Sequence, residues 1–194
     1  MNGSGSKFRA DLLPPVSHKF REIERKAIGI RSFAGAGQNG RLDPYSLAQL
    51  LNLRVVALSD LKQLPEQTRE HLAQSNEWSA GTTGLLPDGS RVIVINEKQS
   101  AGRRAATLME EICHTLLGHD PSSIFGNGKD GSGGRSFDVS VEEEAYSVGA
   151  AALLPYRALT ECLSENQSVD QIARRFGVTR ALVEYRMKVL ELWK

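Results

Sequence analysis

Apolar residues recur every three or four positions along much of this chain, which is the spacing of amphipathic α-helices. The clearest pattern ends at Gly118 and consists of Leu108, Ile112, Leu116 and Leu117. Further helices are predicted over residues 18–33, 61–74 (around Pro65) and 141–154, and two more lie between residues 168 and 192. Another helix is predicted to begin at Pro44, with Leu47, Leu50 and Leu51 facing inward. Ser140 and Pro155 are the expected start and stop of the helix over 141–154.

Three shorter stretches have the composition of β-strands. Aliphatic runs over 53–58 and 91–96 predict two strands, and a stretch rich in Thr, Gly and aliphatic residues over 78–86 predicts a third. The last two flank Pro87-Asp88-Gly89, in which Pro fixes φ and Gly accepts a positive φ. We therefore expect these two strands to form a β-hairpin, followed by the helix that ends at Gly118.

That helix carries charged residues that can bind a metal ion. Glu110 and His114 are four positions apart and share a face, and Glu111 follows Glu110 directly. A zinc peptidase helix reads H-E-x-x-H, with two His ligands and a Glu that acts as general base. Here the sequence is Glu-Glu-Ile-Cys-His, so Glu110 stands where the first His belongs. The alternative is an exposed helix face on which Arg103 and Arg104 pair with the two acids.

Two neighbouring residues leave their roles open. His119 lies just past the helix end, where an interaction with the helix dipole or a capping role is the favoured interpretation, and a role as a ligand or as the partner of a ligand is the alternative. Cys113 is adjacent to His114, and a small buried residue is the simplest interpretation of it.

Composition excludes several broad classes. The 194 residues contain 24 Lys and Arg against 23 Asp and Glu, so the overall charge does not indicate a nucleic-acid or membrane partner. No apolar stretch approaches the roughly 20 residues that span a bilayer. The N-terminal residues have no apolar core of a signal peptide, and the two cysteines suggest no disulfide framework. We expect a cytoplasmic protein.

Three stretches of the chain resemble the ImmA/IrrE family of bacterial metallopeptidases. Residues 107–119 are similar to the family's T-L-x-H-E-x-x-H-x-L-L-x-H helix, and residues 142–155 to its E-x-E-A-N-x-F-A-A-x-L-L-x-P segment. Residues 172–186 are similar to its C-terminal helix-turn-helix-like tail. The chain departs from the family pattern at Glu110, at Tyr146 in place of Asn, and at Val148-Gly149 in place of Phe-Ala.

The resemblance implies an α+β, zincin-like fold, in which a small sheet lies beside the motif helix and a helix-turn-helix-like segment follows. It divides the chain into an N-terminal extension and helix (1–36), a metallopeptidase-type domain (37–158) and a C-terminal helical segment (159–194). By position it implies Glu110, His114 and Glu142 as metal ligands and Glu111 as the catalytic base. The metal would be Zn²⁺, or Mn²⁺ because two ligands are carboxylates, and a metal-free chain is the other outcome.

The expected function is that of a divergent metallo-endopeptidase that cleaves a partner regulatory protein, such as a transcriptional repressor in a stress response, with metal-activated water. The alternative is a catalytically inactive relative that acts as a protein-binding or DNA-associated regulator. DNA binding would require Arg180 and Lys188 to lie on an exposed helix face. A helical hairpin packed on the core is the favoured interpretation of that segment.

Overall fold

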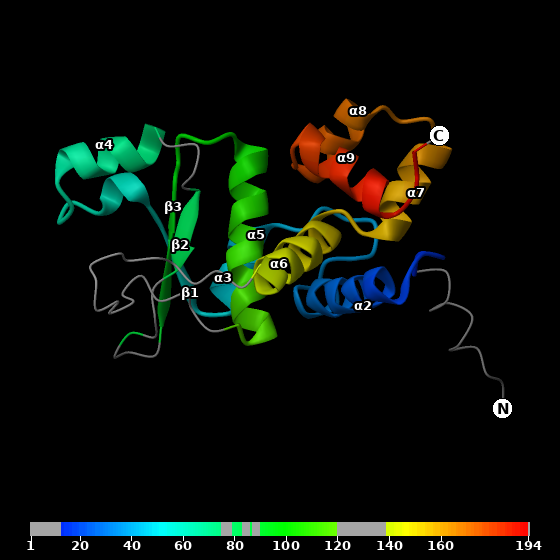
Figure 1. Ribbon diagram of the computed structural model, residues 1–194, viewed down its shortest axis with the longest axis horizontal. Helices are drawn as coiled ribbons and strands as arrows, with labels where there is room; N and C mark the ends of the chain where they lie inside the picture. The colour runs from blue at the N-terminus through cyan, green and yellow to red at the C-terminus, as the bar shows by residue number, and fades with distance from the viewer. Residues whose placement is uncertain (1–12, 75–78, 83–85, 87–89, 120–138, 194) are drawn as a thin grey trace.

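The computed structural model describes residues 13–74, 79–82, 86, 90–119 and 139–193 (Figure 1). Within these ranges the elements are α2 (His18–Phe33), α3 (Pro44–Leu50), β1 (Leu53–Ala57), the 3-10 helix η1 (Leu58–Asp60), α4 (Glu66–Gln74), β2 (Ala80–Thr82), β3 (Arg91–Ile95), α5 (Ala101–Leu117), α6 (Val139–Leu153), α7 (Tyr156–Ser164), α8 (Val169–Phe176) and α9 (Arg180–Val189). This mixture of helices with a small sheet confirms the predicted α+β class.

The sheet has β3 at its centre, with β1 on one side and β2 on the other. β1 runs parallel to β3, with Val55 opposite Ile93, and β2 runs antiparallel, with Gly81 opposite Val94. The antiparallel pair confirms the predicted hairpin, although its turn at 87–89 lies outside the described residues. Ile93 and Ile95 alternate onto one face and are buried. Because that face packs against α5, the sheet fixes the position of the motif helix.

Helix α5 is bounded by the signals that its sequence contains. Ser100 is the N-cap, and its side chain accepts a hydrogen bond from the backbone N–H of Arg103. Gly118 ends the helix at φ 72°, in the left-handed region that glycine adopts readily. Figure 1 shows α5 between the sheet on one side and α6 on the other.

Some sequence predictions of inward-facing and terminal residues were wrong. Leu50 is 61% exposed, because α3 turns only Leu47 and its neighbours toward the core. Leu116 is 37% exposed although it shares a face with the buried Leu108 and Ile112, because it lies in the last turn of α5, beyond Cys113, the last buried residue of the helix. Helix α6 begins at Val139, so Ser140 lies in its first turn and does not cap it. Helix α4 begins after Pro65, which removes 61–65 from the predicted helix.

Charged residues of α2 and α9 meet in the core. The guanidinium of Arg186 on α9 donates from Nη2 to Glu24 Oε1 on α2, and each side chain is 1% exposed. Arg186 also donates from Nε to Leu154 O at 3.0 Å, and Tyr156 N donates to Glu24 Oε2 at 3.2 Å. The hydrophobic cluster includes residues from all three predicted segments, among them Ile23, Leu108 and Leu190.

The C-terminal helices reach the motif helix through the turn between α8 and α9, and α9 packs against α6. Thr179 caps α9 by accepting from Leu182 N, and Gly177 ends α8 at φ 67°. A Cβ atom on Gly102 of α5 would lie 2.7 Å from the backbone carbon of Val178. The turn between α8 and α9 therefore rests directly on the start of α5. In the part of the chain that the structure describes, no helix has the length and apolar character needed to cross a membrane.

Candidate functional site

Helices α5 and α6 approach each other closely, and a glycine makes this possible. A Cβ atom on Gly149 would lie 3.4 Å from Glu110 N and from two atoms of Met109. Small residues, including Ala145 and Ala152, line the same helix and are fully buried. Because Glu142 precedes Gly149 by seven residues and His114 follows Glu110 by four, helices running in opposite directions bring Glu142 toward His114.

His114 and Glu142 are in contact. The distance from His114 Nε2 to Glu142 Oε2 is 3.4 Å, and their side chains are 19% and 38% exposed. Glu143 instead pairs with Lys19 on α2 at 2.7 Å. Glu142 is therefore the acid of this run that contacts His114, which is the position that the resemblance assigns to the third ligand.

Glu110 lies in a strongly perturbed environment. Burial, and then the carboxylates of Glu111 and Glu142, raise its pKa to about 7, against a smaller opposite effect of Arg103. Three of the four predicted site residues are therefore close enough to interact electrostatically. Burial, and then Glu110, also raise the pKa of the Cys113 thiol, which is fully buried as expected.

Glu111 points toward the edge strand of the sheet. Its Oε2 accepts a hydrogen bond from Thr82 Oγ1 on β2. Arg104, one of its two candidate ion partners, donates instead to the backbone carbonyls of Glu97 and Gln99 at 3.0 and 2.6 Å. Thr82 was not identified from the sequence, because β2 has no local pattern that relates it to α5.

A chain of polar contacts extends from His114 away from Glu142. His114 Nδ1 lies 3.2 Å from His119 Nδ1, and His119 Nε2 lies 3.2 Å from Glu144 Oε2. The other carboxylate oxygen of Glu144 accepts from Lys26 Nζ on α2. His119 therefore contacts His114 directly, whereas the sequence favoured a dipole or capping role for it. Glu144 and Lys26 were not identified as part of this site.

The donor chemistry of the site fits a divalent cation. Carboxylates and neutral imidazole are ligands of Zn²⁺, and a larger share of carboxylates favours harder ions such as Mn²⁺. Burial, and then the carboxylates of Glu111 and Glu142, raise the pKa of Glu110, and a cation at this site would favour its charged form. Among the described residues, no three or more His, Cys, Asp or Glu side chains are gathered as a set that could hold a metal ion. The contact between His114 and Glu142 is the part of the predicted ligand set that is already formed.

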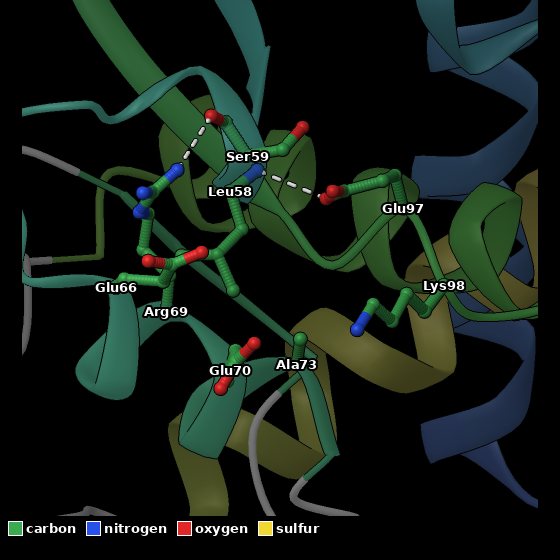
Figure 2. A pocket seen from close by; sticks show the side chains of 8 residues that line it. All are labelled: Leu58, Ser59, Glu66, Arg69, Glu70, Ala73, Glu97 and Lys98. Carbon is green, nitrogen blue, oxygen red and sulfur yellow. Dashed lines mark hydrogen bonds between the residues drawn. The ribbon is translucent and has the colours of Figure 1, made fainter.

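A separate pocket lies near the other end of α5 (Figure 2). Its lining includes Arg69 and Glu97, and both bind the backbone of η1. Arg69 Nη1 donates to Ser59 O at 3.2 Å, and Glu97 Oε2 accepts from Leu58 N at 3.1 Å. The pocket residue Lys98 precedes the start of α5 at Ala101, and roughly 20 Å of helix rise separates Ala101 from His114 in the candidate site. These charged groups hold η1 in place, and none of them belongs to the predicted site.

The basic residues of the C-terminal segment are mostly engaged with acids. Arg180 contacts both Asp170 and Glu184, and Arg186 is buried against Glu24. Arg175 lies 3.6 Å from Glu165. This arrangement leaves little unpaired positive charge on α9 apart from the exposed Lys188. It agrees with a helical hairpin packed on the core.

Comparisons with known proteins agree with this architecture. No match was found among curated proteins. A solved structure described as a Mycobacterium tuberculosis transcriptional regulator is similar, with a TM-score of 0.57 at 20% sequence identity. The similarity covers 93% of this chain and 49% of that one, so this chain spans about half the length of that neighbour. The model of the Peptidase_M78 family, described as the IrrE N-terminal-like domain, matches residues 51–188 of this chain. These residues include α5, α6 and most of α9. This chain therefore belongs to the IrrE N-terminal-like domain family.

Proposed function

We propose that this chain is a divergent metallo-endopeptidase that cleaves a partner regulatory protein at the α5–α6 site. The observation that carries the proposal is the 3.4 Å contact between His114 Nε2 and Glu142 Oε2. These two residues lie on separate helices, so local sequence does not require them to meet. The similarity to a transcriptional regulator supports a regulatory protein as the partner. A cytoplasmic location belongs to the same proposal and is supported by the two free, buried cysteines.

In this mechanism Glu110, His114 and Glu142 would hold the cation. A bound divalent cation would supply Lewis-acid activation of water and of the scissile carbonyl. Glu111 takes a proton from the attacking water on its carboxylate and delivers it to the leaving amine. The hydrogen bond from Thr82 Oγ1 to Glu111 Oε2 orients that carboxylate. Two acidic ligands neutralise more of the cation's charge than one, so hydrolysis is expected to be slower than at a site with two His ligands.

The test combines metal content with peptide hydrolysis. The full chain is stripped with a chelator, reloaded with Zn²⁺ or Mn²⁺, and incubated with a mixed peptide library whose products are read by mass spectrometry. Glu111→Gln is expected to lower cleavage by roughly 10²–10⁴-fold, the usual contribution of a general base, while the fold is retained. Glu143→Gln is the matched control, because Glu143 pairs with Lys19 at the surface. Equal cleavage by wild type and Glu111→Gln would contradict the proposal.

The second candidate is a catalytically inactive relative that binds its regulatory partner through the same surface. It is favoured by Glu110 in the position of a His ligand and by the lack of a gathered three-donor set among the described residues. Glu110→His distinguishes the two candidates. Metal uptake by this variant but not by wild type supports the inactive relative, whereas about one metal per wild-type chain supports the peptidase.

A further inference from the structure

A continuous series of polar contacts joins four side chains, which come from α2, α6, the turn after α5, and α5 itself. Lys26 contacts Glu144, Glu144 contacts His119, and His119 contacts His114. The two imidazole rings meet edge to face, with centroids 5.2 Å apart. The inference drawn from this series of contacts rests on the proposed metal site, and it assigns His119 the role of a positioning residue.

The order of donors and acceptors along this series follows from its charged end. Lys26 donates to one oxygen of Glu144, so Glu144 is a carboxylate and can only accept. His119 Nε2, 3.2 Å from the other oxygen, must then carry a proton. When both imidazole rings are neutral, each has one N–H, so Nδ1 of His119 is an acceptor. His114 Nδ1, 3.2 Å away, must therefore be the donor.

This order of donors and acceptors determines whether His114 Nε2 carries a proton. With its proton on Nδ1, neutral His114 has a lone pair on Nε2, and that lone pair faces Glu142 Oε2 at 3.4 Å. Two acceptor atoms this close need a positive group between them. We propose that His119 and Glu144 hold His114 in the Nδ1-protonated tautomer, so that Nε2 and Glu142 together are free to bind a divalent cation.

The backbone places His119 for this role. Gly118 turns the chain at φ 72°, and His119 N then donates to His114 O at 2.9 Å. This hydrogen bond brings the His119 ring back beside the last turn of α5, where its side chain is only 9% exposed. A residue at the helix end that served the dipole alone would not need this burial.

The first measurement is the tautomer of each histidine in the chelator-treated full chain, read from ¹⁵N chemical shifts of the ring nitrogens. His114 is expected to carry its proton on Nδ1 in wild type. In His119→Ala it is expected to move the proton to Nε2, where it can donate to Glu142. His71→Ala is the control, because His71 is exposed on α4. A wild-type His114 protonated on Nε2, or a tautomer unchanged by His119→Ala, would overturn the proposal.

The second measurement is the dissociation constant for Mn²⁺ and Zn²⁺. Partners of metal-binding histidines typically contribute roughly 10–100-fold in affinity. His119→Ala is expected to lose affinity on that scale, and His119→Asn to recover part of it, because its side-chain carbonyl can accept from His114. Glu144→Gln should weaken binding more than Glu143→Gln. Affinity unchanged in both His119→Ala and Glu144→Gln would overturn the positioning role.

The two measurements separate this inference from the proposed function. If wild type binds neither metal, the peptidase proposal fails, while the tautomer of His114 in the metal-free chain still decides the inference. If metal binds but His114 is protonated on Nε2 in the metal-free chain, the inference fails and the peptidase proposal stands. Circular dichroism of each variant confirms that the fold is retained.

Discussion

Replacing Arg186 by Met is expected to destabilise the entire fold. Arg186 and Glu24 are both 1% exposed, so neither charge is screened by water. Arg186 donates to Glu24 and to Leu154 O, and Glu24 also accepts from Tyr156 N. Met has a similar length and removes both donors. The Glu24 carboxylate would then be buried with Tyr156 N as its remaining donor in this network and with Arg31 as the nearby cation.

The magnitude follows from this burial. Removing one partner of a buried ion pair typically costs about 3–5 kcal/mol, because the other charge is left uncompensated. For a chain of this size, each kcal/mol lowers the melting temperature by about 2–4 °C. Arg186→Met is therefore expected to lower it by about 6–20 °C. The double variant Glu24→Met/Arg186→Met should recover most of this loss, because two apolar side chains need no partner.

Urea unfolding followed by circular dichroism gives the free energies of unfolding for a double-mutant cycle. Arg180→Met is the matched control on the same helix. Arg180 is exposed and pairs with Asp170 and Glu184, so its replacement should leave the midpoint close to wild type. The reasoning is refuted if Arg186→Met costs no more than Arg180→Met. It is also refuted if the double variant is as unstable as the sum of the two single ones.

Two further predictions concern stability. Gly102→Ala should lower the free energy of unfolding by about 1–3 kcal/mol, because the added Cβ would lie 2.7 Å from the backbone of Val178. Gly29→Ala in α2 should raise the free energy of unfolding by about 0.5–1 kcal/mol, because the space around Gly29 is open. Equal effects of the two variants in thermal melts would contradict this reasoning. In chelator, the raised pKa of Glu110, about 7 against 4.5, means that the folded chain binds a proton that the unfolded chain releases. Stability should therefore fall as pH rises from 4.5 to about 7, and Glu110→Gln should flatten that window and be the more stable chain at pH 8. Parallel wild-type and variant midpoints across this range would rule out the shift.

Local signals in the sequence were sufficient for most of the secondary structure. Helix α5 was predicted because Leu108 and Ile112 repeat at helical spacing before a Gly stop, and both residues are fully buried. The contact of Glu142 with His114 was indicated by the family resemblance alone. The spacing of residues within one helix does not show which residues of another helix it will contact. The predicted metal, the catalytic role of Glu111 and the three-part domain division stay predictions.

The sequence could not reveal partners that meet only in the folded chain. Glu24, Arg31 and Arg186 are fully buried, although charged residues at such positions are usually exposed. Arg31 is buried because it donates to Ala152 O at 2.6 Å and to two carbonyls of the loop after α2. The contact between His119 and Glu144 likewise depends on the approach of α6 to α5. The local signal for this contact was that Glu144 belongs to the same run of three glutamates as Glu142.

The buried pair also determines how the C-terminal helices can act. Glu24 lies in the predicted N-terminal segment and Arg186 in the predicted C-terminal one, so α9 cannot leave the core without uncovering an unpaired charge. Ser147 and Tyr185 add a 2.8 Å hydrogen bond between α6 and α9. These contacts predict that α2, the peptidase-like domain and α9 unfold in one transition, which Arg186→Met shifts as a whole. If residues 159–194 instead formed an independent regulatory unit, that variant would lower one transition and leave another at the wild-type midpoint.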